Sequence, residues 1–132
     1  MGTRSLTYVY DDYNITTPIV CMYRQFDGYP SGHGAELAEF LNSFDAIVNG
    51  IRIGDTRKIS NGMGCLAAQM VAFFKTEAGG FYLYPTILNQ DCGQDYEYHV
   101  WNDKVKITCH GDVEFYGTWQ ELAVYCAEDA HA

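Results

Sequence analysis

The stretch Met22-Tyr23-Arg24-Gln25-Phe26-Asp27-Gly28-Tyr29-Pro30-Ser31-Gly32-His33-Gly34 decides how this chain folds. We predict that an apolar strand, Ile19 to Gln25, enters the stretch and that an amphipathic helix begins near Ala35. The glycines of the stretch permit backbone conformations that a side chain would block. Pro30 fixes its own φ and pushes Tyr29 towards an extended backbone. We therefore expect a tightly shaped strand-to-helix corner, which carries Arg24 as its one unambiguous positive charge.

Two interpretations of this corner are open from the residues alone. It is either a structural connector with a surface arginine or a binding element. Ser31-Gly32-His33-Gly34 has the composition of a nest of backbone amides at a helix N-terminus, where an anion can sit. A plain helix start explains the same residues more simply, and without other evidence it is the preferred interpretation.

Secondary structure on either side of the corner follows from periodicity. Arg4 to Tyr10 has the composition of a strand, and we expect it to pair with Ile19 to Gln25 as a hairpin. The helix that begins near Ala35 has four apolar residues at helical spacing, Leu37, Phe40, Leu41 and Phe44.

A second helix is predicted from Asn61, as its N-cap, to about Thr76, before Gly79-Gly80. Its inward stripe consists of Met63, Leu66, Ala67, Met70 and Phe74. No charged residue lies between Lys58 and Lys75, so the outer face is uncharged and consists of Gly64, Ala68, Gln69 and Ala72. Because a surface helix normally has a charged outer face, we expect another subunit to cover this one.

The remainder of the chain is rich in strands. The predicted segments are Phe81 to Leu88, Tyr96 to Trp101, Lys104 to His110 and Asp112 to Gly117. A polar loop, Asn89 to Asp95, separates the first two. Thr118-Trp119-Gln120-Glu121 is a capping box that opens a short third helix. This order predicts one α+β domain over residues 1–132, with antiparallel sheets and two main helices.

Charge limits the classes of partner. The net charge of −9 disfavours binding to a nucleic-acid polymer. The window Ala46 to Thr76 nevertheless contains four basic residues and one acid, Asp55, so it carries +3 and the rest of the chain −12. This basic island suits a small anionic ligand better than a polymer. No run of residues is apolar enough to span a membrane.

Five cysteines, an odd number, with no signal peptide at the start of the chain favour reduced thiols in a cytosol. The spacing of the candidate metal ligands matches no zinc pattern. These candidates are Cys92, His99, Cys109 and His110. We therefore expect neither a metal nor another cofactor.

Arginines and aromatic residues are the better candidates for a binding site. Arg24 and Arg57 have the guanidinium fork that binds phosphates. A base or ribose could stack on aromatic strand residues, namely Tyr8, Tyr10, Phe81, Tyr82 and Tyr84. Asn89 and Asp91 have the side chains that recognise ribose hydroxyls or a base edge. The alternative is that the rings are core residues, and strand alternation turns half of them inward.

Several of these motifs occur together in one known family. The combination of Arg24 to Gly34, Asn61-Gly62-Met63, Asp91-Cys92-Gly93 and Tyr96 to Val100 resembles the first-described family of anti-Thoeris proteins of phages, over nearly the whole chain. Members of that family sequester cyclic ADP-ribose isomers made by bacterial TIR immune enzymes, without cleaving them. Some also hold cyclic oligonucleotides at a separate site, and they assemble as homo-oligomers up to hexamers.

The resemblance implies roles for particular residues. Arg57 and Phe81 would contact the phosphates and base of the cyclic ADP-ribose isomer, and Arg24 would serve cyclic oligonucleotides. Other residues would line the pocket, namely Tyr10, Met70 and Asp91, with either Asn89 or Asp91 in place of a loop asparagine of the family. It also implies a viral protein in the cytoplasm of an infected bacterial host.

The sequence thus predicts a non-enzymatic, oligomeric binder of cyclic nucleotide signals, and two alternatives stay open. One is a hydrolase of such a nucleotide, with His33 or His110 as general base. The other is an inhibitor that binds a host protein through its acidic surface, which strong salt dependence and indifference to nucleotides would reveal.

Overall fold

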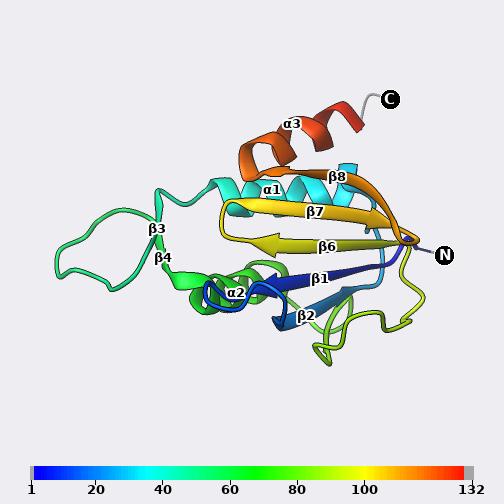
Figure 1. The fold of residues 1–132 in the computed structure, drawn as a ribbon, viewed down its shortest axis with the longest axis horizontal. Coiled ribbons are helices and arrows are strands. Elements are labelled where there is room, and N and C mark those ends of the chain that lie inside the picture. Colours follow the sequence, from blue (N-terminus) through cyan, green and yellow to red (C-terminus); the bar gives the residue numbers. More distant parts are fainter. Residues whose placement is uncertain (1, 130–132) are drawn as a thin grey trace.

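A computed structural model describes residues 2–129, which form a six-stranded sheet with helices on one face (Figure 1). In order across the sheet the strands are β5 (Phe81–Tyr84), β2 (Pro18–Arg24), β1 (Ser5–Tyr10), β6 (Tyr96–Trp101), β7 (Lys104–Cys109) and β8 (Asp112–Thr118). The helices are α1 (Ala35–Asn42), α2 (Gly62–Phe74) and α3 (Trp119–Asp129). A small parallel pair, β3 (Ala46–Val48) and β4 (Ile59–Asn61), lies beside α2.

The pairing confirms the α+β class and the hairpin of β1 with β2. The expectation of antiparallel sheets is wrong at two places, because the central strands β1 and β6 run parallel and so do β3 and β4. A parallel pair needs a long crossover. Here the connection from β1 to β6 includes β2, α1, α2 and β5. Local periodicity therefore gave no sign of the parallel pairing.

Strand alternation divides the sheet residues between two clusters. Val9, Tyr98 and Ile107 pack beneath the helices with all five residues of the predicted α2 stripe. On the opposite face Leu6, Tyr8, Tyr10, Cys21 and Tyr23 form a second buried cluster. The loop after β5 covers part of this face, where the Tyr8 hydroxyl donates to the carbonyl of Ile87 (3.0 Å).

The corner is as tightly shaped as the sequence predicts. A single π-helical turn, Pro30–Gly34, leads directly into α1. A Cβ at Gly28 would lie 2.9 Å from the backbone nitrogen of Ser5, so a larger residue would push the corner away from β1. The Tyr98 hydroxyl donates to the carbonyl of Gly28 (2.7 Å), which ties the corner to the centre of the sheet.

Several element ends differ from the predictions. Asn61 precedes α2, but its side chain accepts from the amide of Gly50 (2.8 Å), and a carboxylate oxygen of Asp12 accepts from the first-turn amide of Met63 (3.0 Å) instead. The strand that begins at Phe81 ends at Tyr84, before Pro85, whose ring removes the backbone donor that a ladder needs.

The third helix is longer than predicted. It has 11 residues, whereas α1 has eight, so the fold has three main helices rather than two among its described residues. The predicted capping box is present, since the amide of Glu121 donates to Thr118 Oγ1 (3.1 Å) and the amide of Thr118 donates to Glu121 Oε1 (2.8 Å). Over residues 2–129, every helix is too short or too polar to cross a membrane. All five cysteines are free.

Candidate functional site

Arg24 is buried inside the corner, with 5% of its surface exposed. Its Nε donates to the carbonyl of Phe26 (2.7 Å), and its Nη1 contacts both the carboxylate of Glu36 and Nδ1 of His33 (3.3 Å). The guanidinium also lies over the ring of Phe81, 5.0 Å from its centroid. Arg24 therefore holds the corner together and offers a phosphate almost no surface in this protomer.

His33 lies in the core beside Arg24. Because its Nδ1 accepts from Arg24, its Nε2 carries the proton and donates to Thr7 Oγ1 (2.7 Å). Burial, followed by the charge of Arg24, lowers the pKa of His33 to about 3. The ring is neutral and has no exposed surface, so as a general base His33 could not reach a substrate without local unfolding.

The backbone amides of Ser31, Gly32 and His33, which the alternative interpretation assigned to an anion nest, are already engaged. The amide of Gly32 donates to the carbonyl of Tyr29 (2.9 Å), and that of His33 donates to the carbonyl of Asp27 (2.7 Å). The amide of Ser31 donates to a carboxylate oxygen of Asp129 at the end of α3 (3.1 Å). The plain helix start is thus the interpretation that the geometry supports.

Arg57 lies on the loop between β3 and β4, which extends from the body of the protein at the left of Figure 1. Its guanidinium forms a two-point contact with Asp55, with Nη2–Oδ2 and Nε–Oδ1 distances of 2.9 and 3.1 Å. Hydrogen bonds from Arg57 lower the pKa of Asp55 to about 2. The Arg57 side chain is 53% exposed, so it is oriented but accessible.

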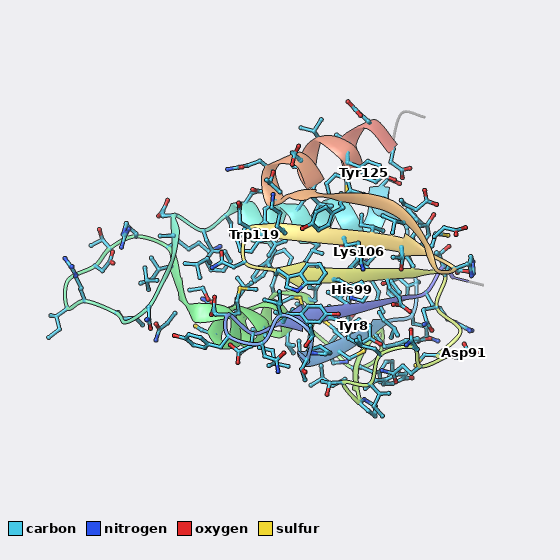
Figure 2. All side chains as sticks on the ribbon, in the orientation of Figure 1. Tyr8, Asp91, His99, Lys106, Trp119 and Tyr125 are labelled. Atoms are coloured by element: carbon cyan, nitrogen blue, oxygen red, sulfur yellow. The ribbon has the colours of Figure 1, made fainter. Side chains whose placement is uncertain are left out.

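Asn89 and Asp91 come together at the rim of a recess of about 250 Å³. Figure 2 shows Asp91 at the end of the protomer away from the β3–β4 loop. The recess is lined by Asn89, Gln90, Asp91, Gln94, Asp95, Glu97, Thr108, His110 and Gly111. Within the described part of the chain, this lining has carboxylates and carboxamides but no lysine or arginine, so it suits hydroxyl groups or a base edge better than a phosphate.

A chain of hydrogen bonds connects Tyr10 to this recess. The Tyr10 hydroxyl is 2.6 Å from His99 Nδ1, and His99 Nε2 is 3.2 Å from Glu97 Oε1. Gln94 donates to the other oxygen of Glu97 (3.0 Å). The hydrogen bond to His99 lowers the pKa of Glu97, whereas burial raises that of Tyr10 to about 12. Tyr10 is therefore a protonated, buried phenol behind the recess rather than a wall of it.

Sequence reasoning missed this relay of Tyr10, His99 and Glu97. A signal was present for the pair of Glu97 and His99 alone, because they are two residues apart on a strand and so lie on one face. The same face carries stacked rings. Figure 2 shows Tyr8 and His99 beside each other, and their ring centroids are 5.2 Å apart. The ring centroids of Tyr10 and Trp101 are 4.7 Å apart. For Tyr8 and Tyr10 the core interpretation of the aromatic residues is thus the right one.

The two remaining predicted residues lie on the helical side of the sheet. Met70 is 1% exposed and belongs to the core, so in this protomer its side chain has no surface for a ligand. Phe81 is half-buried between Arg24 and Phe74, whose ring centroid is 5.4 Å from its own. One protomer therefore brings Asn89 and Asp91 together, and Arg24 with Phe81, but it does not bring Arg57 to either pair.

The structure also places the other candidate groups. Over residues 2–129, no group of three or more His, Cys, Asp or Glu side chains is arranged to hold a metal ion. His110 is exposed at the recess, with its Nε2 3.2 Å from Asp95 Oδ1.

In comparisons with known proteins, no family model, curated protein or solved structure matched this chain.

Proposed function

We propose that this protein binds cyclic nucleotide immune signals, in the first place cyclic ADP-ribose isomers made by TIR enzymes, and sequesters them without cleavage. It would act as a phage anti-Thoeris protein in the cytoplasm of the infected bacterium, with cyclic oligonucleotides as a second ligand class. The family resemblance of the corner, the Asn61-Gly62-Met63 junction and the Asp91 loop motivates this proposal.

The observation that carries the proposal is the exposed Arg57 guanidinium, which Asp55 holds in one orientation on the protruding loop. A planar guanidinium binds the oxygens of a pyrophosphate by two hydrogen bonds at once. An exposed ion pair contributes little to stability. A ligand can therefore replace Asp55 as the partner of Arg57 at small cost.

The ribose and base would be recognised in the recess that Asn89 and Asp91 line. Among residues 2–129, that recess has no lysine or arginine, and it lies away from the β3–β4 loop, so we expect the complete site to need Arg57 from a second subunit. The outer face of α2 favours such assembly, since Gly64, Ala68 and Ala72 are exposed and no charge lies among them. The resemblance favours a hexamer.

Two residues that could act as a general base are unsuited to cleavage. His33 is buried, and Tyr10 has a pKa of about 12 and so stays protonated.

One observation favours a second candidate function, a nucleotide hydrolase. His110 and Asp95 both line the recess and are in contact, which is the arrangement of a general base and its orienting carboxylate. Recovery of an intact or a cleaved ligand distinguishes the two functions.

Replacing Arg57 with alanine is expected to weaken binding of a cyclic ADP-ribose isomer at least tenfold, because a charge-assisted contact contributes roughly 1.5–3 kcal/mol. Titration calorimetry measures the change. Arg52→Ala is the matched control, because Arg52 is an exposed arginine on the same loop. Unchanged affinity in Arg57→Ala, with wild-type circular dichroism, would place the phosphate contact elsewhere.

Introducing a charge on the outer face of α2 is expected to reduce the oligomer without unfolding the chain. In Ala68→Glu the carboxylate would have to be desolvated at the subunit interface, whereas Ala123→Glu, on the exposed side of α3, is the control. Light scattering gives the mass of each species. A monomeric wild-type protein, or an Ala68→Glu variant of unchanged mass, would contradict the assembly.

A further inference from the structure

We infer that a second recess, at the start of α2, binds the sugar of a ribonucleoside through its vicinal hydroxyl groups. The recess lies between the turn after β1, the end of β3 and the junction of β4 with α2. It shares no residue with the candidate site above and needs no phosphate, so this inference goes beyond the proposed function.

The recess is large enough for such a ligand. Its volume is about 440 Å³, within the range of roughly 300–1,000 Å³ that is typical of small-molecule sites. Four separate segments of the chain converge on it, including residues 11–13, residues 47–49 and Asn102. Gly64, at the edge of the recess, faces open space, because a Cβ built on it would meet no atom within 4 Å.

The polar lining excludes an anion. Asp12 already occupies the start of α2, where one carboxylate oxygen accepts from the amide of Met63 (3.0 Å) and the other from the side chain of Asn102 (3.4 Å). Asp11 adds a second carboxylate to the lining, and none of the described residues that line it is a lysine, arginine or histidine. A phosphate would be repelled, so the recess suits a neutral ligand rich in hydroxyl groups.

The polar groups of the lining that have no hydrogen-bond partner among residues 2–129 are of the kinds that bind a diol. The carboxylate of Asp11 can accept from two adjacent hydroxyls, as acidic side chains do for the ribose of dinucleotides. Asn61 uses its carbonyl for the amide of Gly50, and no hydrogen bond within residues 2–129 engages its NH₂ group, which can donate to a sugar oxygen. Asn49 supplies a second carboxamide.

An aromatic side chain at the rim supplies the partner for a base. Tyr13 lines the recess and is 88% exposed, far more than a tyrosine that stabilises a core. Its ring can stack on a purine or pyrimidine, and stacking of this kind tolerates any base. Together, the diol contacts and the ring favour a nucleoside over a simple sugar.

Adenosine is the probe that tests this site, in titration calorimetry or chemical-shift titration of the full chain. We expect saturable binding to one site per chain, at least tenfold weaker for 2′-deoxyadenosine. Asp11→Asn and Tyr13→Ala should each weaken adenosine binding at least fivefold. The matched controls Asp112→Asn and Tyr116→Ala, on exposed positions of β8, should leave it unchanged.

Arg57→Ala should also leave adenosine binding unchanged, which separates this site from the proposed phosphate contact. Equal binding of adenosine and 2′-deoxyadenosine, equal binding of glucose and adenosine, or no adenosine binding at millimolar concentration would each overturn the inference. If the Asp11 or Tyr13 variants do not fold, the inference is tested by comparing the affinities of adenosine and 2′-deoxyadenosine for the wild-type protein.

Discussion

Replacing Arg24 with alanine is expected to lower the free energy of unfolding by about 3 kcal/mol. The change leaves the buried Nδ1 of His33 without its donor, which costs roughly 1–3 kcal/mol. It also removes the guanidinium from the rings of Phe26 and Phe81, a contribution of about 0.5–2 kcal/mol. Urea unfolding followed by circular dichroism measures the sum.

The control for this prediction is Arg52→Ala, which removes an exposed arginine and should change stability by less than about 0.5 kcal/mol. An Arg24→Ala variant as stable as the wild type, which had lost only affinity for a cyclic oligonucleotide, would show that Arg24 serves a ligand. The burial of this arginine thus turns a predicted binding residue into the residue on which the corner depends.

Acidification is expected to destabilise the protein through His33. The folded protein holds the pKa of His33 at about 3, whereas an unfolded histidine has a pKa near 6.5. Between these values the unfolded chain binds a proton that the folded chain refuses, so stability falls as the pH decreases from 6.5 towards 3. At pH 4 the free energy of unfolding is lower than at pH 7 by at most about 3 kcal/mol from this one group.

The measurement is the unfolding free energy between pH 7 and pH 4 for the wild type and for His33→Gln. We expect the variant to be less stable at pH 7 but to lose less stability on acidification. If the variant does not fold, the ring resonances of His33 in the wild type provide the test. A titration of that ring between pH 5 and pH 7 would contradict the account.

Local features of the fold were predictable because neighbouring residues determine them. Examples are the capping box of Thr118 and Glu121, the apolar stripe of α2 and the glycines of the corner. The parallel pairing of β1 with β6 was not, because it depends on a crossover of more than 80 residues. The cap of α2 was missed for the same reason, since Asp12 lies 51 residues before Met63.

The candidate site was predictable only in part. Asn89 and Asp91 were expected near each other because they share a loop, and they line one recess. The association of Arg57 with Phe81 rested on the order of segments along the chain, and a single protomer does not bring the two together. The link from Tyr10 to His99 spans 89 residues, so no pattern in the neighbourhood of either residue indicated it.

We propose that the protein retains a cyclic nucleotide and does not cleave it. The most direct test is to incubate the purified protein with cyclic ADP-ribose isomers, remove the unbound ligand by filtration, denature the complex and determine the mass of what is released. We expect that a cyclic ADP-ribose isomer is retained and is released with its mass unchanged. Release of a hydrolysed product, or no retention of any isomer, would contradict it.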